Sequence, residues 1–308
     1  MAKKKSNNKT KNIYEIIIVV IFVLISVLVW NNSNKTQDTN IKVNPISAEE
    51  SQNVELVGED RIQIHFFDVG QADSILLISN NETMLIDAGT NSTGKTVVQN
   101  LKKLGISKID YLVGTHPHED HIGGLDDVIN NFEIGTIYMP KIQTNTKTFE
   151  DVLDAISNKG LKVTSPNKGD TFTVGNVNCE IMLCTPELAE EKDNLNLSSI
   201  VIRTVYKEQS YLFMGDAETE NEKLRDWPQT NVLKVGHHGS KTSSSESFLN
   251  QVLPKIAIIQ VGKDNKYGLP KQETIDKLNK LGTLIYRTDE NKNILLESDG
   301  TNNKISFY

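Results

Sequence analysis

Three of the chain's six histidines fall within seven residues, in the segment THPHEDH at 115–121. This segment directly follows an apolar run, 109–114, that is typical of a strand. Imidazoles and carboxylates crowded onto one strand-end loop cost free energy unless a cation neutralises and orients them. Divalent zinc takes both side-chain types as ligands. The segment therefore predicts a metal site at a strand end; the alternative, a solvated polar loop, is disfavoured by the density of the cluster.

The spacing within the cluster indicates two metal positions. His116 and His118 can face the same way from an extended loop, whereas Asp120 and His121 enter the following turn and face a second position. Two more histidines are adjacent in the chain, at 237–238. Two divalent metals a few ångströms apart would satisfy such a set of ligands.

The N-terminal part of the chain predicts a membrane anchor. Residues 13–30 form an apolar run, interrupted only by Glu15, that is long enough to span a bilayer. Five lysines within residues 1–12 predict that this basic segment is cytoplasmic. Polar residues 31–60 then predict a flexible linker to an extracellular domain at 61–308. A cleaved signal peptide is the alternative, but no small-residue cleavage pattern precedes Trp30.

Composition limits the classes of protein that the domain can belong to. The chain carries 33 basic and 40 acidic side chains, a net charge of -7. Residues 1–60 hold seven of each sign, so the whole excess lies on 61–308. This balance disfavours a broad cationic platform for nucleic acid. With only two cysteines, the chain is neither a disulfide scaffold nor a cysteine-based metal site.

The order of the expected elements predicts an α/β (α+β) fold. Strand-like runs come as antiparallel hairpins, and helical stretches interrupt them in both halves of the domain, which suits two sheets packed face to face with helices outside. No Gly-x-Gly-x-x-Gly follows a strand, so a dinucleotide fold is disfavoured. Strands are expected at 62–69, 74–79, 83–87, 109–114, 136–139, in hairpins within 161–185, and at 199–205, 211–214, 232–235 and 256–261. Helices are expected at 93–104, 125–131, 148–158, 219–226, 245–253 and 272–281.

The His-x-His-x-Asp-His run resembles the signature of the metallo-β-lactamase superfamily of metal-dependent hydrolases. Four flanking motifs, FDVGQAD at 67–73, LIDAG at 85–89, MGDAE at 214–218 and LKVGHHGS at 233–240, resemble the extracellular hydrolase domain of ComEC-type DNA-uptake proteins. The resemblance covers residues 61–308. It implies a four-layer αββα sandwich with the active site along one edge.

The resemblance also implies a role for each residue of the motifs. One metal would be bound by His116 and His118 and the other by Asp120, His121 and His237, with Asp216 bridging both. Asp87 would support the ligands by hydrogen bonding. Asp68, Asp73 and His238 would line the pocket as catalytic residues together with Asp120, and Gln71, Asn196 and Ser199 would support the site. Without the resemblance, Asp87 could be only a turn residue and Asp216 only a helix N-cap. Either histidine at 237–238 could be the ligand, with His237 favoured because it lies nearer the strand end.

The chain departs from the superfamily pattern at one metal site. No histidine lies between His121 and His237, where most members supply a further ligand. The ComEC-type pattern has Asn and Ser in this interval, matched here by Asn196 and Ser199. The first metal would then be short of protein ligands, so manganese becomes an alternative to zinc. Leu269 also replaces a histidine that is usual in the subgroup.

The function expected from the resemblance is hydrolysis of a phosphodiester outside the cell, with DNA as a transient substrate. Ser240 and Lys241, just beyond the histidine pair, are expected to hold phosphate oxygens. An envelope phosphodiesterase of the teichoic-acid or phosphocholine type, another ester or lactam hydrolase, and a non-catalytic binding module of an uptake apparatus are the alternatives. The net charge predicts capture and cleavage rather than extended binding.

Overall fold

The computed structural model describes residues 60–308, which form two β-sheets with helices between the strands. In spatial order, the first sheet contains β15 (Asn303–Phe307), β14 (Ile294–Ser298), β1 (Ile62–Phe66), β2 (Ile75–Ser79), β3 (Glu82–Ile86), β4 (Lys108–Val113), β5 (Glu133–Tyr138) and β6 (Val163–Thr164). The second sheet contains β13 (Leu284–Arg287), β12 (Ile256–Ile259), β11 (Val232–Lys234), β10 (Gln209–Phe213), β9 (Val201–Tyr206), β8 (Val177–Leu183) and β7 (Thr171–Val174).

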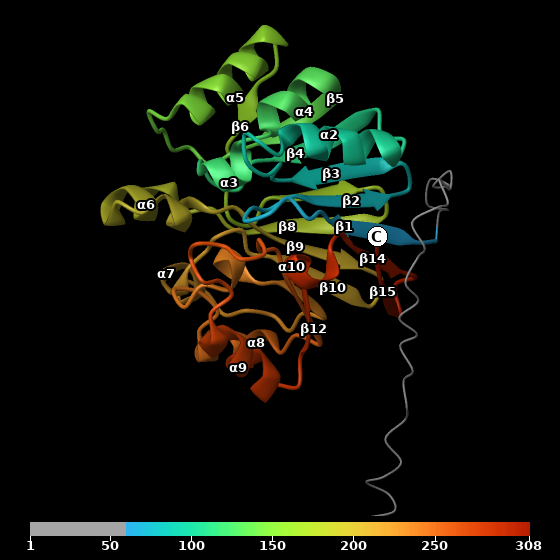
Figure 1. Cartoon of the computed structure of the whole chain (residues 1–308), viewed down its shortest axis with the longest axis vertical. Coiled ribbons are helices and arrows are strands. Elements are labelled where there is room, and N and C mark those ends of the chain that lie inside the picture. The colour runs from blue at the N-terminus through green and yellow to red at the C-terminus, as the bar shows by residue number, and fades with distance from the viewer. Residues whose placement is uncertain (1–59) are drawn as a thin grey trace, which may run out of the picture. The chain divides into compact units, whose positions relative to one another are not determined.

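Helices cover the outer faces of both sheets. Their bounds are α2 (Gly94–Lys103), α3 (Glu119–Ile122), α4 (Leu125–Asn131), α5 (Lys147–Asn158), α6 (Pro186–Lys192), α7 (Thr219–Glu222), α8 (Glu246–Val252), α9 (Gln272–Lys280) and α10 (Thr288–Asn291), with 3-10 turns η1 (Leu195–Ser198) and η2 (Gly236–Gly239). Figure 1 shows α2, α4 and α5 on one side of the paired sheets and α8 and α9 on the other. The predicted sandwich of two sheets with helices outside is confirmed.

Three layers of apolar packing hold the sandwich together, and strand periodicity explains them. Along β2, Ile75 and Leu77 face the second sheet, whereas Leu76 and Ile78 face α2 and α4. Strand β10 alternates in the same way, because Leu212 packs toward α8 and α9 while its neighbours point between the sheets. Strands that are buried on both faces read as continuous apolar runs, which is why the sequence predicts them.

The parallel strands place their carboxyl ends along one edge of the sandwich. Strands β3, β4 and β5 are parallel in the first sheet, and β10, β11, β12 and β13 are parallel in the second. The loops that follow β3, β4, β10 and β11 carry the LIDAG, THPHEDH, MGDAE and GHHGS residues in that order. Ligands bind at the carboxyl ends of strands in such sheets, so the fold gathers these loops at one candidate site.

The structure differs from the sequence predictions in several elements. Strand β6 pairs in parallel with β5 instead of joining a hairpin, although β7 and β8 form the expected antiparallel pair. Helix α7 is a single turn that ends at Glu222 rather than Asp226. Helix α6, which begins with Pro186, is absent from the sequence predictions. Both cysteines, Cys179 and Cys184, are free.

The predicted cytoplasmic segment, anchor and nearly all of the linker lie outside the described residues. Within residues 60–308, no helix has the length and apolar character needed to cross a bilayer.

Candidate metal centre

Asp216 lies at the centre of the strand-end loops, between four imidazoles. It follows β10 and is 2% exposed. Its Oδ1 atom lies 3.2 Å from His121 Nε2. Its Oδ2 atom lies 3.6 Å from His237 Nε2 and 3.9 Å from His116 Nε2. One carboxylate thus faces two groups of nitrogen ligands, which is the arrangement that a bridging ligand requires.

A compact group of four ligand atoms surrounds Asp216 Oδ1. Asp120, His121, Asp216 and His238 each contribute one atom, and these atoms lie within 4.8 Å of one another. His238 Nε2 is 3.4 Å from Asp120 Oδ2 and 3.7 Å from Asp216 Oδ1. Three of the atoms, His121 Nε2, Asp216 Oδ1 and His238 Nε2, are buried without a hydrogen-bond partner. Buried polar atoms are normally paired, so this donor set fits a divalent metal held by imidazole and carboxylate.

Hydrogen bonds on the far side of each ring turn these nitrogens toward the site. His121 Nδ1 lies 2.8 Å from Asp87 Oδ2, to which it donates. His238 Nδ1 donates to the Gln260 carbonyl at 2.9 Å. A ring nitrogen that donates leaves the lone pair on the other nitrogen, here Nε2, free for a metal. Asp87 therefore has the supporting position that the sequence predicts.

His116 and His118 lie beside this cluster, on the Oδ2 side of Asp216. His116 Nε2 is 3.0 Å from His118 Nδ1. The Thr115 hydroxyl donates to Asp87 Oδ2 at 2.8 Å, so its oxygen can accept from His116 Nδ1 at 3.1 Å. Because His116 Nδ1 then carries the proton, its Nε2 atom, which faces Asp216, keeps a free lone pair. Asp87 thus orients ligands on both sides of the site.

The histidine pair differs from the sequence prediction. The motifs predict His237 in the second site, with Asp120 and His121, but the structure places His238 there. His237 lies on the other side of Asp216, with its Nδ1 3.1 Å from Glu218 Oε1. Both residues have positive φ angles, 49° and 50°. This left-handed backbone, which costs free energy for a residue with a Cβ, lets two successive side chains point to the two sides of one carboxylate.

The carboxylates concentrate negative charge that the site must balance. Burial lowers the pKa of His116 and of His118, so both imidazoles are neutral. Burial also opposes protonation of His121, but Asp216 and Asp87 raise its pKa well above the ordinary value. For His238, burial is outweighed by Asp216 and Asp73, which raise the pKa to about 10. A site that holds protons this firmly favours cations, and a divalent metal supplies the same positive charge.

Asp73 is a supporting residue rather than a group that lines the pocket. It is 1% exposed and lies 2.6 Å from the ammonium group of Lys234, which is itself fully buried. Its other oxygen lies 3.3 Å from His238 Nδ1. Although burial raises the pKa of Asp73, Lys234 and His238 bring it below the ordinary value. The expected catalytic role is therefore corrected, because this carboxylate lies behind His238.

Glu218 contacts both His237 and Asn196, which lies in the interval where most superfamily members have a further histidine. Its carboxylate accepts from Asn196 Nδ2 at 3.1 Å and from the Thr242 hydroxyl at 2.9 Å. Asn196 Oδ1 is buried without a hydrogen-bond partner. Ser199 accepts from the Asp216 amide at 3.1 Å and so fixes the backbone of the central carboxylate. Asn196 thus contacts the Glu218 carboxylate, and Ser199 contacts the backbone of Asp216.

Three other predicted residues contact parts of the chain away from the four-residue cluster. Asp68 lies 3.5 Å from Lys292 and accepts from the Gly70 amide. Gln71 Oε1 accepts from the Gly262 amide at 3.2 Å. The Ser240 hydroxyl is 3.1 Å from that of Thr242 and is mostly buried.

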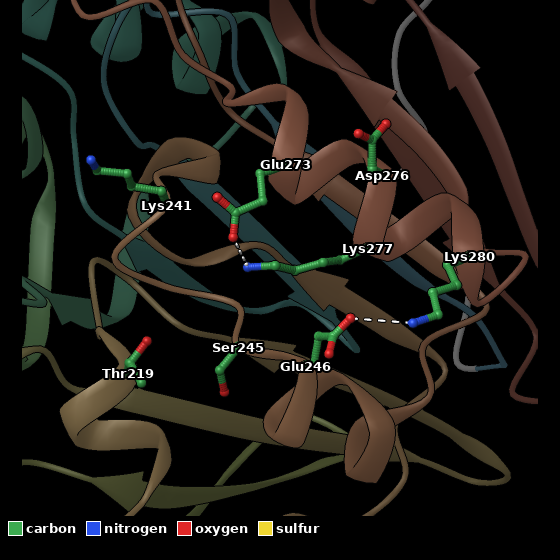
Figure 2. A pocket seen from close by; sticks show the side chains of 8 residues that line it. All are labelled: Thr219, Lys241, Ser245, Glu246, Glu273, Asp276, Lys277 and Lys280. Carbon is green, nitrogen blue, oxygen red and sulfur yellow. Dashed lines mark hydrogen bonds and ion pairs between the residues drawn. The ribbon is translucent and has the colours of Figure 1, made fainter.

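Lys241 lies in a separate cleft between α7, α8 and α9. Figure 2 shows its side chain apart from two ion pairs there, Glu273 with Lys277 and Glu246 with Lys280. No contact between Lys241 and the histidines is seen in residues 60–308, so the structure does not bring it to the metal ligands.

Sequence reasoning missed three residues that orient the ligands: Lys234, Glu218 and Gln260. The first two lie inside the motifs LKVGHHGS and MGDAE, where the histidines and Asp216 are the more conspicuous ligands. A lysine in the middle of an apolar strand was the available signal for Lys234, because a buried cation needs a partner. Gln260 acts through its backbone carbonyl, which carries no signal in the sequence.

Comparisons with known proteins agree with this arrangement. A family model described as the metallo-beta-lactamase superfamily matches residues 67–263. The chain is 30% identical over 254 residues to "ComE operon protein 3" of Bacillus subtilis, covering 75% of this chain and 32% of that protein. It is 29% identical over 241 residues to "Competence protein ComA" of Neisseria gonorrhoeae, covering 76% and 32%. The chain thus spans about a third of the length of these relatives.

Among solved structures, the metallo-beta-lactamase fold protein YhfI from Bacillus subtilis aligns over 78% of this chain and 100% of its own. The TM-score is 0.53 at 9% sequence identity, so this likeness concerns the fold alone.

Proposed function

Because the chain belongs to the metallo-β-lactamase superfamily, we propose that it is a phosphodiesterase that uses two divalent metals and cleaves DNA. The fold and the His/Asp cluster support a metal-dependent hydrolase. The observation that carries the proposal is the convergence of His121 Nε2, Asp216 Oδ1 and His238 Nε2, three buried ligand atoms without other partners.

The residues divide into two sets around Asp216. Asp120, His121, His238 and Asp216 Oδ1 would hold one metal. His116, His118, His237 and Asp216 Oδ2 face the other side and would hold the second. This assignment gives His237 to the site that the sequence left short of a histidine, so both positions have imidazole and carboxylate ligands. Zinc suits such ligands, and manganese remains the alternative.

The protein's own contribution is to orient ligands and to keep charge in place. When bound, two divalent metals lower the pKa of water and stabilise the charge on a departing oxygen. Asp87 holds His121 and, through Thr115, His116. Glu218 holds His237, and Ser199 holds the backbone of Asp216. Such preorganisation means that the ligands need not move as charge develops during the reaction.

The choice of DNA as substrate is supported by the competence relatives and by the predicted topology. The name of the gonococcal relative describes a competence protein, and the motifs resemble ComEC-type domains. The predicted anchor at 13–30 would hold the domain outside the membrane, where incoming DNA passes. Cleavage of a polyanion by an acidic domain is physically reasonable, because two bound divalent cations dominate the local field.

Metal analysis and hydrolysis assays on the full chain in mild detergent test the proposal. We expect two metal equivalents per chain, and cleavage of single-stranded DNA and of a chromogenic phosphodiester. Asp216→Ala should abolish both activities, and His237→Ala and His238→Ala should each lose one metal equivalent. His65→Gln, a histidine change on β1 outside the site, is the matched control and should keep metal and activity. A metal-replete wild-type protein that cleaves no phosphodiester, or that cleaves only a chromogenic β-lactam, would refute the assignment.

A further inference from the structure

The loop at residues 262–271, between β12 and α9, presents an aromatic side chain to solvent. Tyr267 is 56% exposed, the largest value among the exposed large apolar side chains of residues 60–308. Exposure of a single apolar residue is common. Tyr267 differs because its loop is hydrogen-bonded to Gln71 and to the histidine loop.

One end of this loop is attached to the histidine loop, and the other end to the loop that also carries Asp73. At its start, the Gly262 amide donates to Gln71 Oε1 at 3.2 Å. At its end, the Lys271 amide donates to the carbonyl of Gly239, the residue after His238, at 2.9 Å. A Cβ on Gly239 would lie 2.6 Å from the Pro270 side chain, so the two segments are in close contact. At most about 3.5 Å per residue separates Tyr267 from Lys271, so the tyrosine lies within roughly 15–20 Å of the histidine loop.

Hydrogen bonds across the loop hold it in one shape. The Asn265 side chain donates to the carbonyls of Gly262 and Leu269, at 2.9 Å and 2.6 Å. The same side chain accepts from the Leu269 amide at 3.0 Å. Lys271 Nζ donates to the Tyr267 carbonyl at 2.6 Å. An aromatic ring on a preorganised loop loses little conformational entropy when it binds a partner.

The loop is locally basic on a domain whose net charge is negative. Lys263 and Lys266 are exposed, and neither forms an ion pair with any residue in the range 60–308. The ammonium group of Lys266 lies 5.1 Å from the centre of the Tyr267 ring. Asp264 is the one acidic residue between 262 and 271. A free cation over an aromatic ring, with a second exposed lysine in the same loop, is a combination that binds single-stranded nucleic acid.

We propose that the Tyr267 loop is a binding subsite for single-stranded nucleic acid, in which a base stacks on Tyr267 and Lys263 and Lys266 contact the flanking phosphates. This inference rests on the proposed function and names the form of its substrate. A strand a few nucleotides long would span the separation of up to roughly 15–20 Å between Tyr267 and the histidine loop. A membrane surface is disfavoured as the partner, because the loop offers one exposed ring and membrane binding scales with buried apolar area.

The test compares two strands that carry the same phosphates but differ in bases. A fluorescent oligothymidylate and an abasic strand of equal length are titrated with the full chain in detergent and EDTA, so that the measurement does not depend on cleavage. Stacking on an aromatic residue contributes about 1–3 kcal/mol per base, or roughly 5- to 150-fold in affinity. Tyr267→Ala should therefore weaken binding of oligothymidylate by this factor and change the abasic strand less than about twofold. Tyr267→Phe, which keeps the ring, should bind as the wild type does.

Loss of the two lysines is expected to change the affinity for the two strands in a different way. The double variant Lys263→Gln/Lys266→Gln should weaken both strands equally and reduce the slope of log affinity against log salt by roughly 0.7 for each phosphate that a lysine no longer neutralises. An equal loss for both strands in Tyr267→Ala would overturn the stacking role, as would retention of full affinity. Cleavage of the chromogenic phosphodiester is measured in parallel, so a failure of the proposed function is distinguished from a failure of this subsite.

Discussion

Replacing Lys234 with methionine leaves the Asp73 carboxylate buried without its ion-pair partner. The two groups are 2.6 Å apart, with side chains 0% and 1% exposed. Lys234 also donates to the Val235 carbonyl at 3.0 Å, which would lose its donor. Removing one member of a buried pair costs about 3–5 kcal/mol, and the expected loss lies within this range although His238 stays 3.3 Å from the other Asp73 oxygen, because His238 also interacts with Asp216. For a domain of this size each kcal/mol lowers Tm by roughly 2–4 °C, so we expect a decrease of about 6–20 °C.

A double-mutant cycle measures this coupling directly. Lys234→Met, Asp73→Asn and the combined variant are unfolded with urea and followed by circular dichroism, in EDTA so that metal binding does not contribute. The combined variant leaves no unpaired charge, so its loss of unfolding free energy should be smaller than the sum of the single losses by at least about 2 kcal/mol. The same variants should show weakened metal binding, because Asp73 lies against His238.

An exposed pair provides the control for this cycle. Lys280 and Glu246 are 3.3 Å apart, with side chains 76% and 62% exposed. Lys280→Met should change the unfolding free energy by less than about 1 kcal/mol. A coupling energy between Asp73 and Lys234 as small as that of the exposed pair would refute the argument that burial makes this ion pair essential.

Three further outcomes are expected. Asp87→Asn should weaken metal affinity by about 10- to 100-fold in chelator competition, because Asp87 orients ligands on both sides of Asp216; unchanged affinity would contradict that role. Saturating the metal sites at 100 times the dissociation constant should stabilise the domain by about 2.7 kcal/mol per site against urea, and an unchanged urea midpoint would show that metal does not bind the folded state. Burial lowers the pKa of His65 to about 3, so the folded state favours the neutral imidazole. The unfolded chain binds a proton at this residue below about pH 6.5, so the folded state loses stability as the pH falls from 6.5 toward 3. Changing pH from 7.5 to 5.0 should cost the wild type about 2 kcal/mol more than His65→Gln, measured in EDTA.

The fold could be predicted where burial on both faces left continuous apolar runs, as in β2 and β10. The sequence also predicted α4 with its observed bounds, 125–131, because its apolar positions follow a helical period. Strand β6 is only two residues long and both residues are exposed, so the pattern there could not distinguish a hairpin from a parallel pairing with β5. Pairing of distant strands depends on tertiary packing rather than on local composition.

The metal ligands could be predicted because their chemistry is concentrated in short motifs. What spacing could not decide was the direction of two adjacent side chains, His237 and His238. In an extended strand they would point to opposite faces, but both lie in the left-handed region of a 3-10 turn. Their positions relative to Asp216 follow from that backbone. In the same way, the burial of Asp73 depends on a contact with Lys234, 161 positions later in the chain.

The net charge of -7 overstates the negative charge at the surface of this domain. Asp73, Asp87 and Asp216 are nearly completely buried, and each is held against a lysine or a histidine. The charge of these buried carboxylates acts mainly on the metal position, because charges a few ångströms apart in a buried site interact strongly. It acts much less on a polyanion in solution, because salt screens charges over a Debye length. In the proposed subsite, a strand of nucleic acid would contact Lys266, which lies over the Tyr267 ring, and the exposed Lys263 of the same loop. A domain with an acidic total can therefore bind its substrate through a local basic loop, and the salt dependence of binding should reflect those two lysines and not the net charge.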